Sequence, residues 1–234
     1  MKVSVIIPAY NEEAAIGSVV RAVPRHLVQE VIVVDNGSTD ATAAEAQSAG
    51  ARIVREPFKG YGAACRAGLK ACGTADVVVF LDGDTSDDPA ELPLVLKPIE
   101  EGLADFVIGS RLAGAFLDPN SMPCHARMGN RFVALLLNRA YGLRITDIGS
   151  FRALRAQLLL SLQMEQMTYG WPVEMLVKAA QRGARIAEVP VSYRRRIGVS
   201  KVSGTIRGSV LAAYYMLWLP LFYLANGSGR SNSR

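Results

Sequence analysis

Residues 77–84 read Val77-Val78-Val79-Phe80-Leu81-Asp82-Gly83-Asp84 and decide the fold. The apolar run is too short for a stable helix and is typical of a strand buried on both faces of a parallel sheet. The two carboxylates that follow flank a glycine, whose missing side chain lets a ligand approach the turn closely. Mg²⁺ takes oxygen ligands from one or two carboxylates and fills its other positions with phosphate oxygens and water. The stretch therefore predicts a strand that ends in a site for a divalent metal and a diphosphate.

Strand-like and helix-like segments alternate on both sides of this stretch. Strong strand candidates cover 3–7 and 31–34, and weaker ones cover 52–55 and 106–108. Helical patterns lie between them, over 12–22, 41–49, 61–72 and 89–101. This order predicts an α/β fold with a mostly parallel, Rossmann-like sheet flanked by helices, and with ligands at the carboxyl ends of the strands.

The three strong strands end in polar clusters at residues 8–13, 35–40 and 82–88. Because the carboxyl ends of parallel strands meet at one edge of a sheet, we expect these clusters to form a single crevice. Asp35 stands where a carboxylate accepts hydrogen bonds from a ribose or a nucleobase, although Asp also closes turns onto its own backbone. Residues 59–62, Lys-Gly-Tyr-Gly, precede a helix and are a further candidate to hold a phosphate through backbone N–H groups.

The second half of the chain is less regular. Helices are predicted over 122–141 and 171–181. A late strand is predicted over 186–193, with Pro190 at an edge or a bulge because proline cannot donate to a sheet ladder.

The last apolar run, 209–225, is uncharged and follows a basic stretch. Its 17 residues are the lower limit for crossing a bilayer. We predict a membrane-contacting helix over 205–225 that lies in the interface or inserts shallowly. The alternative is a buried C-terminal core helix. Residues 226–234 are expected to form a flexible tail.

Charge is divided unevenly along the 234 residues, whose net charge is +5. Residues 1–117 hold 10 Lys/Arg against 16 Asp/Glu, and residues 118–234 hold 16 against 5. The first part therefore suits cations, and the second suits phosphate groups, a membrane surface or nucleic acid. We expect no nucleic acid, because the crevice is rich in carboxylates and the basic half has no aromatic-interleaved binding motif. The length favours a single domain, and three cysteines without CxxC spacing favour a reduced, cytosolic setting.

In this order on the strand ends, residues 8–13, 33–40 and 82–84 resemble glycosyltransferase family 2. More narrowly, the chain resembles the branch of dolichyl-phosphate mannose synthases and polyprenyl-phosphate glycosyltransferases. The resemblance runs from residue 2 to about residue 204. It implies a GT-A-type domain over 1–204, with a nucleotide-binding part over about 1–117 and an acceptor part over about 118–204.

The resemblance also assigns roles to individual residues of the donor site. The resemblance implies that Asp82 and Asp84, with Gly83 between them, bind the metal and the diphosphate. The implied cofactor is Mg²⁺ or Mn²⁺. The positions that hold the nucleotide sugar match five residues on the first two strand ends, Pro8, Tyr10, Glu12, Val33 and Asp35. Arg195 and Lys201 match a loop that closes over the donor, where Arg offers a bidentate fork and Lys a movable charge. The alternative for residues 194–196 is a solvated basic surface.

On the acceptor side, Gly109-Ser110-Arg111 resembles a family segment whose arginine reaches the phosphates, so Arg111 is a catalytic candidate with Asp84. Arg111, Arg127 and Arg131 are candidates for an acceptor phosphate. Asp147 lies in a segment that matches the acceptor side loosely, and it is the candidate base if the acceptor is a hydroxyl. One departure concerns the metal, because mannose synthases usually have glutamine two residues after the second aspartate and this chain has Ser86.

We expect inverting, metal-dependent transfer of a hexose from UDP-glucose or GDP-mannose to a polyprenyl or dolichyl phosphate, at the cytoplasmic face of a membrane. A phosphate acceptor is already anionic, so positioning and charge stabilisation suffice without a base. The alternatives are a sugar or small-molecule hydroxyl as acceptor, and a non-catalytic homologue that binds nucleotide sugars. A nucleotidyltransferase should show a Gly-rich phosphate loop after the first strand, where this chain has residues 10–13, Tyr-Asn-Glu-Glu. The donor sugar and a homo-oligomeric state stay open.

Overall fold

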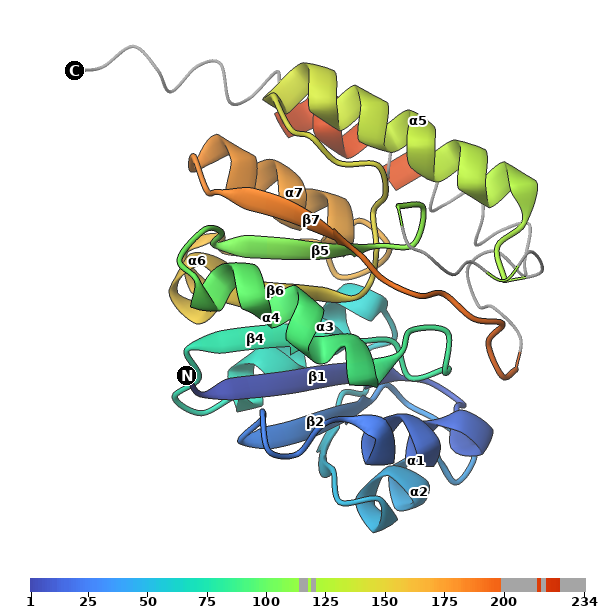
Figure 1. The fold of residues 1–234 in the computed structure, drawn as a ribbon. Coiled ribbons are helices and arrows are strands. Elements are labelled where there is room, and N and C mark those ends of the chain that lie inside the picture. The colour runs from blue at the N-terminus through green and yellow to red at the C-terminus, as the bar shows by residue number, and fades with distance from the viewer. Residues whose placement is uncertain (114–117, 119–120, 199–213, 216–217, 224–234) are drawn as a thin grey trace.

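The computed structural model describes residues 1–113, 118, 121–198, 214–215 and 218–223 (Figure 1). Lys201, the tail 226–234 and much of the apolar run lie outside these residues. The strands are β1 (Val3–Ala9), β2 (Glu30–Asp35), β3 (Arg52–Arg55), β4 (Val77–Phe80), β5 (Phe106–Ser110), β6 (Arg152–Arg155) and β7 (Ile186–Pro190). They form one sheet in the order β3-β2-β1-β4-β6-β5-β7.

The helices are α1 (Glu13–Ala22), α2 (Thr42–Ser48), α3 (Tyr61–Ala71), α4 (Leu92–Glu100), α5 (Cys124–Tyr141), α6 (Ala156–Ser161) and α7 (Trp171–Gln181), with a 3₁₀ turn η1 (Pro89–Glu91) before α4. Asp88 begins this turn, because its side chain accepts the backbone N–H of Ala90 at 3.1 Å. Pro89 follows at the first position, where its missing N–H costs nothing.

The sheet is mostly parallel, as predicted, with one strand that the sequence did not reveal. β1 pairs in parallel with β2 and β4, so that Ala9 lies opposite Asp35 and Ile6 opposite Phe80. Their carboxyl ends therefore meet at one edge. β6 runs antiparallel between β4 and β5. β7 is an edge strand that ends at Pro190, in agreement with the place expected for this proline.

Two apolar clusters cover the two faces of the sheet because side chains of a strand alternate between faces. Ile6 of β1 packs in a cluster with α3, α5, α6 and α7. Its neighbours Val5 and Ile7 pack in a second cluster with α1 and α4. Both faces are thus buried under helices, as the uninterrupted apolar strands require (Figure 1).

The described part of the C-terminal run, residues 214–215 and 218–223, is helical. Leu219 is 0% exposed and belongs to the core cluster, whereas Trp218 and Phe222 are each 41% exposed. The Tyr141 hydroxyl donates to the Pro220 carbonyl, which ties these residues to α5. Within the described residues, no helix has both the length and the apolar character needed to cross a membrane.

Candidate active site

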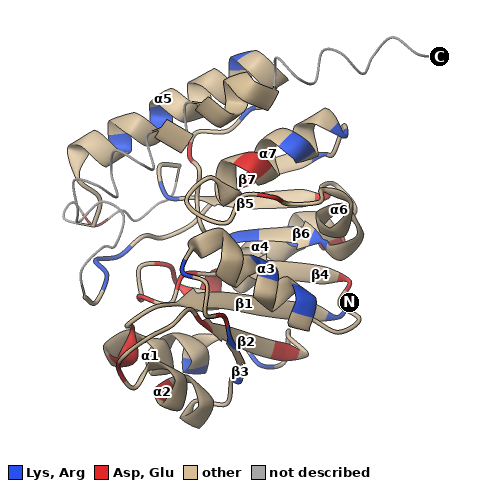
Figure 2. Cartoon of the chain, turned by 180° about the vertical axis from the view of Figure 1, so that it is seen from behind, with Lys and Arg blue, Asp and Glu red and all other residues tan. Residues whose placement is uncertain are grey.

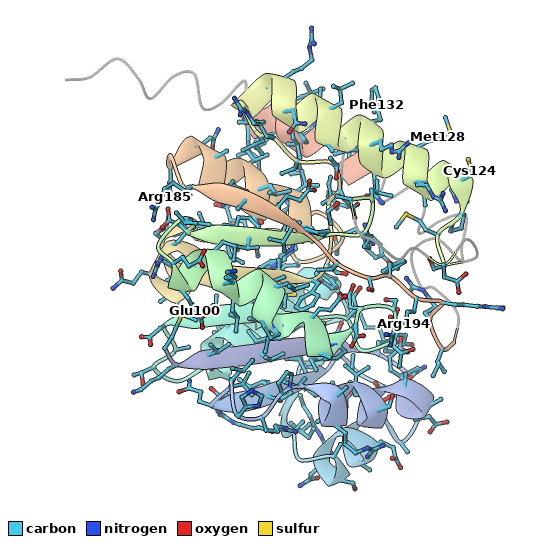
Figure 3. All side chains as sticks on the ribbon, viewed as in Figure 1. Glu100, Cys124, Met128, Phe132, Arg185 and Arg194 are labelled. Atoms are coloured by element: carbon cyan, nitrogen blue, oxygen red, sulfur yellow. The ribbon has the colours of Figure 1, made fainter. Side chains whose placement is uncertain are left out.

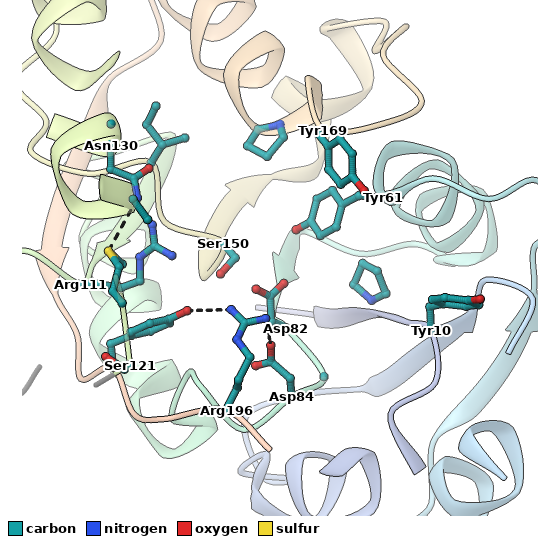
Figure 4. Close-up of a pocket in the computed structure, with 18 of the residues that line it drawn as sticks. Tyr10, Tyr61, Asp82, Asp84, Arg111, Ser121, Asn130, Ser150, Tyr169 and Arg196 are labelled. Atoms are coloured by element: carbon teal, nitrogen blue, oxygen red, sulfur yellow. Dashed lines mark hydrogen bonds and ion pairs between the residues drawn. The ribbon is translucent and has the colours of Figure 1, made fainter. Parts of the chain in front are cut away.

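The carboxyl ends of β1 and β4 open into a cavity of about 640 Å³, a typical size for a ligand pocket. Figure 4 shows Arg111 and Asn130 on one side of it, Tyr61 and Tyr169 on the other, and Asp82 and Asp84 between them. Of the residues predicted for the site, the lining includes Pro8, Tyr10, Glu12, Asp82, Gly83, Asp84 and Arg111. The crevice therefore lies at the predicted edge of the sheet.

The two carboxylates of the Asp82-Gly83-Asp84 turn have different surroundings. Asp84 Oδ1 accepts the backbone N–H of Ser86 at 3.0 Å and the Ser86 hydroxyl at 2.5 Å. Asp84 Oδ2 forms an ion pair of 2.7 Å with Nη1 of Arg196. Burial, together with the charge of Asp84, raises the pKa of the Asp82 carboxyl. Ser86 is 0% exposed and is not among the lining residues, so it orients Asp84 and does not replace the glutamine of mannose synthases as a ligand.

The segment that carries Arg196 runs alongside this turn. The backbone N–H of Arg194 donates to the Ser86 carbonyl at 2.9 Å, and that of Ile197 donates to the Asp84 carbonyl at 3.0 Å. The pairing holds the Arg196 guanidinium in the cavity, where Nη2 also donates to the Tyr193 hydroxyl at 3.1 Å. Burial opposes the charge on Arg196, but Asp84 favours it and raises its pKa above the usual value.

Arg196 reaches the cavity in place of Arg195, the arginine that the resemblance indicated. Arg195 is exposed and is not among the lining residues. Successive side chains of an extended segment point in opposite directions, which places the two neighbouring arginines on different sides. Lys201, the other residue predicted for this loop, lies outside the described residues.

Arg111 and Asp147 form a buried ion pair at the edge of the cavity. Arg111 Nε donates to Asp147 Oδ2 at 2.7 Å, and Nη2 donates to Oδ1 at 2.8 Å. The backbone N–H of Arg111 donates to Oδ2 at 3.1 Å. Burial alone would raise the pKa of Asp147, but the charge and hydrogen bonds of Arg111 hold it below the usual value.

This geometry gives Asp147 a different role from the base expected for a hydroxyl acceptor. Its side chain is 0% exposed, it does not line the cavity, and both oxygens accept hydrogen bonds from Arg111. A general base must reach the proton that it takes. The expectation of a base is therefore not supported, and Asp147 instead holds the Arg111 guanidinium 5.0 Å from the centre of the Tyr193 ring.

A further carboxylate, Asp87, contacts the cavity-lining residue Ser150 and was not predicted as a site residue. It is 3% exposed, Oδ2 accepts the Ser150 hydroxyl at 3.2 Å, and Oδ1 has no partner among the described residues. Burial, followed by the charge of Asp82, raises the pKa of Asp87 to about 8. Ser150 lines the cavity and links this carboxylate to the floor.

Tyr10 and Lys59 form the end of the cavity that lies away from Arg111. Lys59 Nζ donates to the Tyr10 hydroxyl at 2.9 Å and lies 4.4 Å from the centre of its ring. Asn36 orders the loop before Lys59, because its amide donates to two carbonyls within residues 56–58 and its Oδ1 accepts the N–H of Gly60. Residues 59–61, which belong to the segment predicted to hold a phosphate, line the cavity.

Val33 and Asp35, predicted to hold the nucleotide, are not among the lining residues. The Val33 side chain is 0% exposed and packs in the core. Asp35 Oδ1 accepts the backbone N–H of Ser38 at 2.9 Å, which is the local turn considered as its alternative role. Asn36, the residue after Asp35, lines the cavity instead.

The loop over residues 163–170 supports the wall that carries Tyr61 and Tyr169. Its Met167 carbonyl accepts the N–H of Ala63 at 2.9 Å. A side chain at Gly62 would place its Cβ 2.1 Å from the carbonyl oxygen of Gln166, so glycine is required there. Tyr169 carried no sequence signal, since no motif marks the loop in which it lies.

Glu174, at the start of α7, holds this loop from behind. Its buried carboxylate accepts the backbone N–H groups of Glu165 and Gln166 at 2.9 and 2.8 Å. It also pairs with Lys178 at 2.7 Å and accepts the Tyr223 hydroxyl at 3.0 Å. The C-terminal helical residues are therefore connected to a wall of the cavity.

α5 contributes a largely apolar wall. The apolar and small residues on and just before it that line the cavity are Met122, Pro123, Ala126, Gly129, Phe132 and Val133. His125 and Asn130 add polar groups. Arg127 and Arg131 lie on the same helix but are not among the lining residues, so their contact with an acceptor phosphate stays a prediction.

The residues at the floor fit a divalent ion that is shared with a diphosphate. Within the described residues, no group of three His, Cys, Asp or Glu side chains could hold a metal ion by itself. Mg²⁺ is commonly bound by one or two carboxylates together with substrate phosphates, which matches Asp82 and Asp84. Asp84 Oδ2 already holds a cation in the structure, the Arg196 guanidinium.

Comparison with known proteins decides the family. Residues 4–161 match the model of glycosyl transferase family 2. The chain belongs to this family. The family 2 chain is 40% identical over 211 residues to an uncharacterised glycosyltransferase of Mycobacterium tuberculosis, covering 90% of this chain and 94% of the relative. It is 36% identical over 212 residues to a dolichyl-phosphate hexose transferase of Haloferax volcanii, covering 89% and 90%.

A solved structure resembles this glycosyltransferase over most of its length. It is glucosyl-3-phosphoglycerate synthase from Mycobacterium tuberculosis in complex with Mn²⁺, uridine diphosphate and phosphoglyceric acid. The TM-score is 0.75 at 27% identity, and the match covers 94% of this chain and 78% of the other. The family 2 glycosyltransferase therefore has the GT-A-like α/β fold that the sequence predicted.

Proposed function

We propose that this glycosyltransferase transfers a hexose from UDP-glucose or GDP-mannose to the phosphate of a polyprenyl or dolichyl lipid. The observation that supports this proposal is that the cavity is charged in one region and apolar in the next. Carboxylates and guanidinium groups gather at the floor, and the wall that α5 provides beside them is apolar. The first region suits a diphosphate, and the second suits an isoprenoid chain.

The proposed reaction needs no general base. An oxygen of the acceptor phosphate is anionic and uses its lone pair to form the new bond to the anomeric carbon. The bond from that carbon to the diphosphate breaks, and the nucleoside diphosphate leaves with the electron pair. Attack from the side opposite the leaving group inverts the anomeric centre. Arg111 and Arg196 stabilise the charge of the leaving diphosphate, since both are permanent cations that line the cavity.

Asp82 and Asp84 are the residues that would hold Mg²⁺ or Mn²⁺ in this reaction. Bound there, the ion supplies positive charge to the diphosphate. Ser86 holds Asp84 through Oδ1, which leaves Oδ2 on the side of Arg196. The oxygen-only donor set suits a hard divalent cation.

Similarity supports both partners of the proposed reaction. The dolichyl-phosphate hexose transferase of Haloferax volcanii supports a lipid phosphate acceptor. The complex of glucosyl-3-phosphoglycerate synthase with Mn²⁺ and uridine diphosphate supports a uridine nucleotide donor and a divalent ion. GDP-mannose is retained as a donor because the motifs resemble those of mannose synthases, although Ser86 departs from their pattern.

We also propose that the enzyme works at the cytoplasmic face of a membrane, because lipid phosphates are held in bilayers. The excess of 16 Lys/Arg over 5 Asp/Glu in residues 118–234 supports this location. The division into a nucleotide-binding part before residue 117 and an acceptor part after it stays part of the proposal. The carboxylate turn belongs to the first part, and α5 belongs to the second.

A donor and acceptor screen tests the function. The full chain is incubated with UDP-glucose or GDP-mannose, Mn²⁺ or Mg²⁺, and a short polyprenyl phosphate, and nucleotide release is measured together with the glycolipid formed. We expect release only when the lipid phosphate is present. Transfer to 3-phosphoglycerate but not to the lipid would replace the proposal with a small-molecule hydroxyl acceptor. Nucleotide binding without turnover in every combination would identify a non-catalytic homologue.

A further inference from the structure

α5 carries a row of exposed apolar side chains on the side away from the sheet. Met128, Phe132 and Leu135 are 67%, 59% and 54% exposed. Their spacing of four and three residues places them on one face of the helix, and Figure 3 shows Met128 and Phe132 pointing outward. Val133 and Leu137, on the opposite face, are buried in the core.

The C-terminal helical residues, which contact α5, add exposed aromatic side chains. Tyr214, Trp218 and Phe222 stack in sequence, with ring centres 6.0 and 4.6 Å apart. Their exposed fractions are 54%, 41% and 41%. The hydrogen bond from Tyr141 to Pro220 places these residues against α5, where Figure 1 draws them in red. Single exposed apolar residues are ordinary, but a row of them on one helix face, together with three exposed stacked rings on a segment that contacts this helix, indicates an interaction surface.

The charge of this region has one sign. α5 carries Arg127, Arg131 and Arg139 and no Asp or Glu, as the blue segments along it show (Figure 2). A negatively charged surface therefore complements it. A second copy of this chain, paired through the same face around a twofold axis, would set these arginines against each other, which disfavours the pairing.

The exposed row is continuous with the cavity. Phe132 is 59% exposed and also lines the cavity, and His125 on the same helix does both as well. Whatever covers the row therefore lies at the mouth of the cavity, next to its apolar wall.

We propose that the surface formed by Met128, Phe132 and Leu135 of α5, with Tyr214, Trp218 and Phe222, docks on a bilayer that contains anionic lipid. We call it the docking face. Trp and Tyr rings suit the boundary between headgroups and acyl chains, and arginines beside them attract anionic headgroups. The inference rests on the proposed function, because it identifies the bilayer as the source from which a lipid phosphate enters beside Phe132.

Vesicle sedimentation of the full chain tests the docking face without donor, acceptor or metal. The vesicles contain phosphatidylcholine alone or phosphatidylcholine with an equal amount of phosphatidylglycerol. The test variant is Met128→Glu with Leu135→Glu, two positions that do not line the cavity. The matched control is Leu103→Glu with Leu160→Glu, since these leucines are 66% and 63% exposed elsewhere on the surface.

We expect the wild type and the control to sediment with the anionic vesicles, and the test variant to partition about tenfold or more weakly, because it replaces apolar contact with negative charge. Added salt should weaken the binding of the wild type, and neutral vesicles should bind it less. Equal partitioning of the test and control variants would overturn the proposal. So would a wild-type dimer that the test variant dissociates without a change in vesicle binding, since the occupant would then be a second copy.

Binding of uridine diphosphate and of guanosine diphosphate, each with Mn²⁺ and measured by calorimetry on both variants, separates this inference from the proposed function. Lost vesicle binding with retained nucleotide binding supports the docking face. Retained vesicle binding in a chain that binds no nucleotide would remove the proposed function and leave the membrane surface in place.

Discussion

The side chains of Arg111 and Asp147 are joined by two hydrogen bonds of 2.7 and 2.8 Å, and only the arginine faces the cavity. In the proposed reaction, the carboxylate therefore acts through the guanidinium that it orients. A base would have to contact the acceptor itself, and Asp147 is covered by protein on every side. The pair thus separates a positioning role from a catalytic one.

Asp147→Asn should lower kcat by on the order of tenfold to a hundredfold, because an asparagine keeps the shape but no longer holds Arg111 by charge, and small misplacements of a reacting group have effects of this size. Nucleotide binding should change less. Loss of one partner of a buried pair also costs about 3–5 kcal/mol of stability, so thermal unfolding must be followed in parallel. The control is Asp105→Asn, at a more exposed ion pair of 2.7 Å with Arg185. Unchanged kcat in a folded Asp147→Asn protein would contradict the positioning role.

Arg195 and Arg196 offer a matched pair of adjacent residues. Arg196→Ala should lower kcat/KM for the nucleotide sugar by on the order of tenfold to a hundredfold, since a hydrogen-bonded charge in the cavity is lost. Arg195→Ala should stay within about twofold, because an exposed arginine contributes little. Steady-state kinetics of both variants decides between them. A larger effect at Arg195 would restore the assignment that the family resemblance suggested.

Asp84→Ala should abolish sugar transfer while the fold remains, because in the proposed reaction Asp84 supplies an oxygen to the metal and diphosphate, and its side chain belongs to neither apolar core cluster. Turnover is measured over a range of Mn²⁺ concentrations, and circular dichroism reports the fold. Asp88→Ala serves as the control, because Asp88 pairs with Arg194 at 2.6 Å and does not line the cavity. Metal-dependent transfer that persists in Asp84→Ala would refute the site.

Gly129 tests which part of the cavity receives the acceptor. A Cβ at this position meets nothing within 4 Å, so Gly129→Leu adds a side chain to open space along the α5 wall. We expect transfer to a polyprenyl phosphate to fall while binding of uridine diphosphate stays unchanged. Gly129→Ala should be active, and helix propensity makes it more stable by up to about 1 kcal/mol. Weakened nucleotide binding in Gly129→Leu would place the donor, not the lipid, at this wall.

Asp87 should make stability depend on pH in an unusual direction. Its pKa is about 8 in the folded chain, against about 4 for an ordinary aspartate. Between these values the folded chain holds a proton that the unfolded chain releases, so this residue lowers stability as pH rises. Asp87→Asn does not titrate, and its advantage over the wild type in unfolding free energy should grow from about pH 4 to about pH 8. Urea unfolding of both proteins across this window measures it, and a constant difference would show that the carboxyl is not held protonated.

The elements of the first half could be predicted because their signals are local. Apolar runs such as residues 77–81 are typical of buried strands, and the polar residues after them mark the sheet edge. β6 was missed, since Arg152 and Arg155 interrupt its apolar character. Arg152 is nevertheless buried, with its guanidinium donating to the carbonyls of Gly149 and Pro172, a solution that only the tertiary structure provides.

The candidate site likewise contains residues that local sequence signals predict and residues that only the tertiary structure brings to the cavity. Asp82, Asp84 and Arg111 stand at strand ends, and all three line the cavity. Arg196 lines it one position after the predicted Arg195, because its direction depends on pairing with the turn at residues 84–86 and not on its own neighbours. Tyr169 comes from a loop that Glu174 holds in place by hydrogen bonds. The sequence pattern does not predict these contacts.

Leu219 has a practical consequence for anyone who wishes to purify this enzyme without detergent. Its side chain fills a space against Gly170, where an added Cβ would come within 2.5 Å of it. Shortening the chain at residue 204 would expose that hollow and remove the Tyr223 hydroxyl from Glu174, so improved solubility would come with a loosened wall of the cavity. Polar replacements at Trp218 and Phe222, whose rings lie partly in solvent, are the gentler route to a soluble protein.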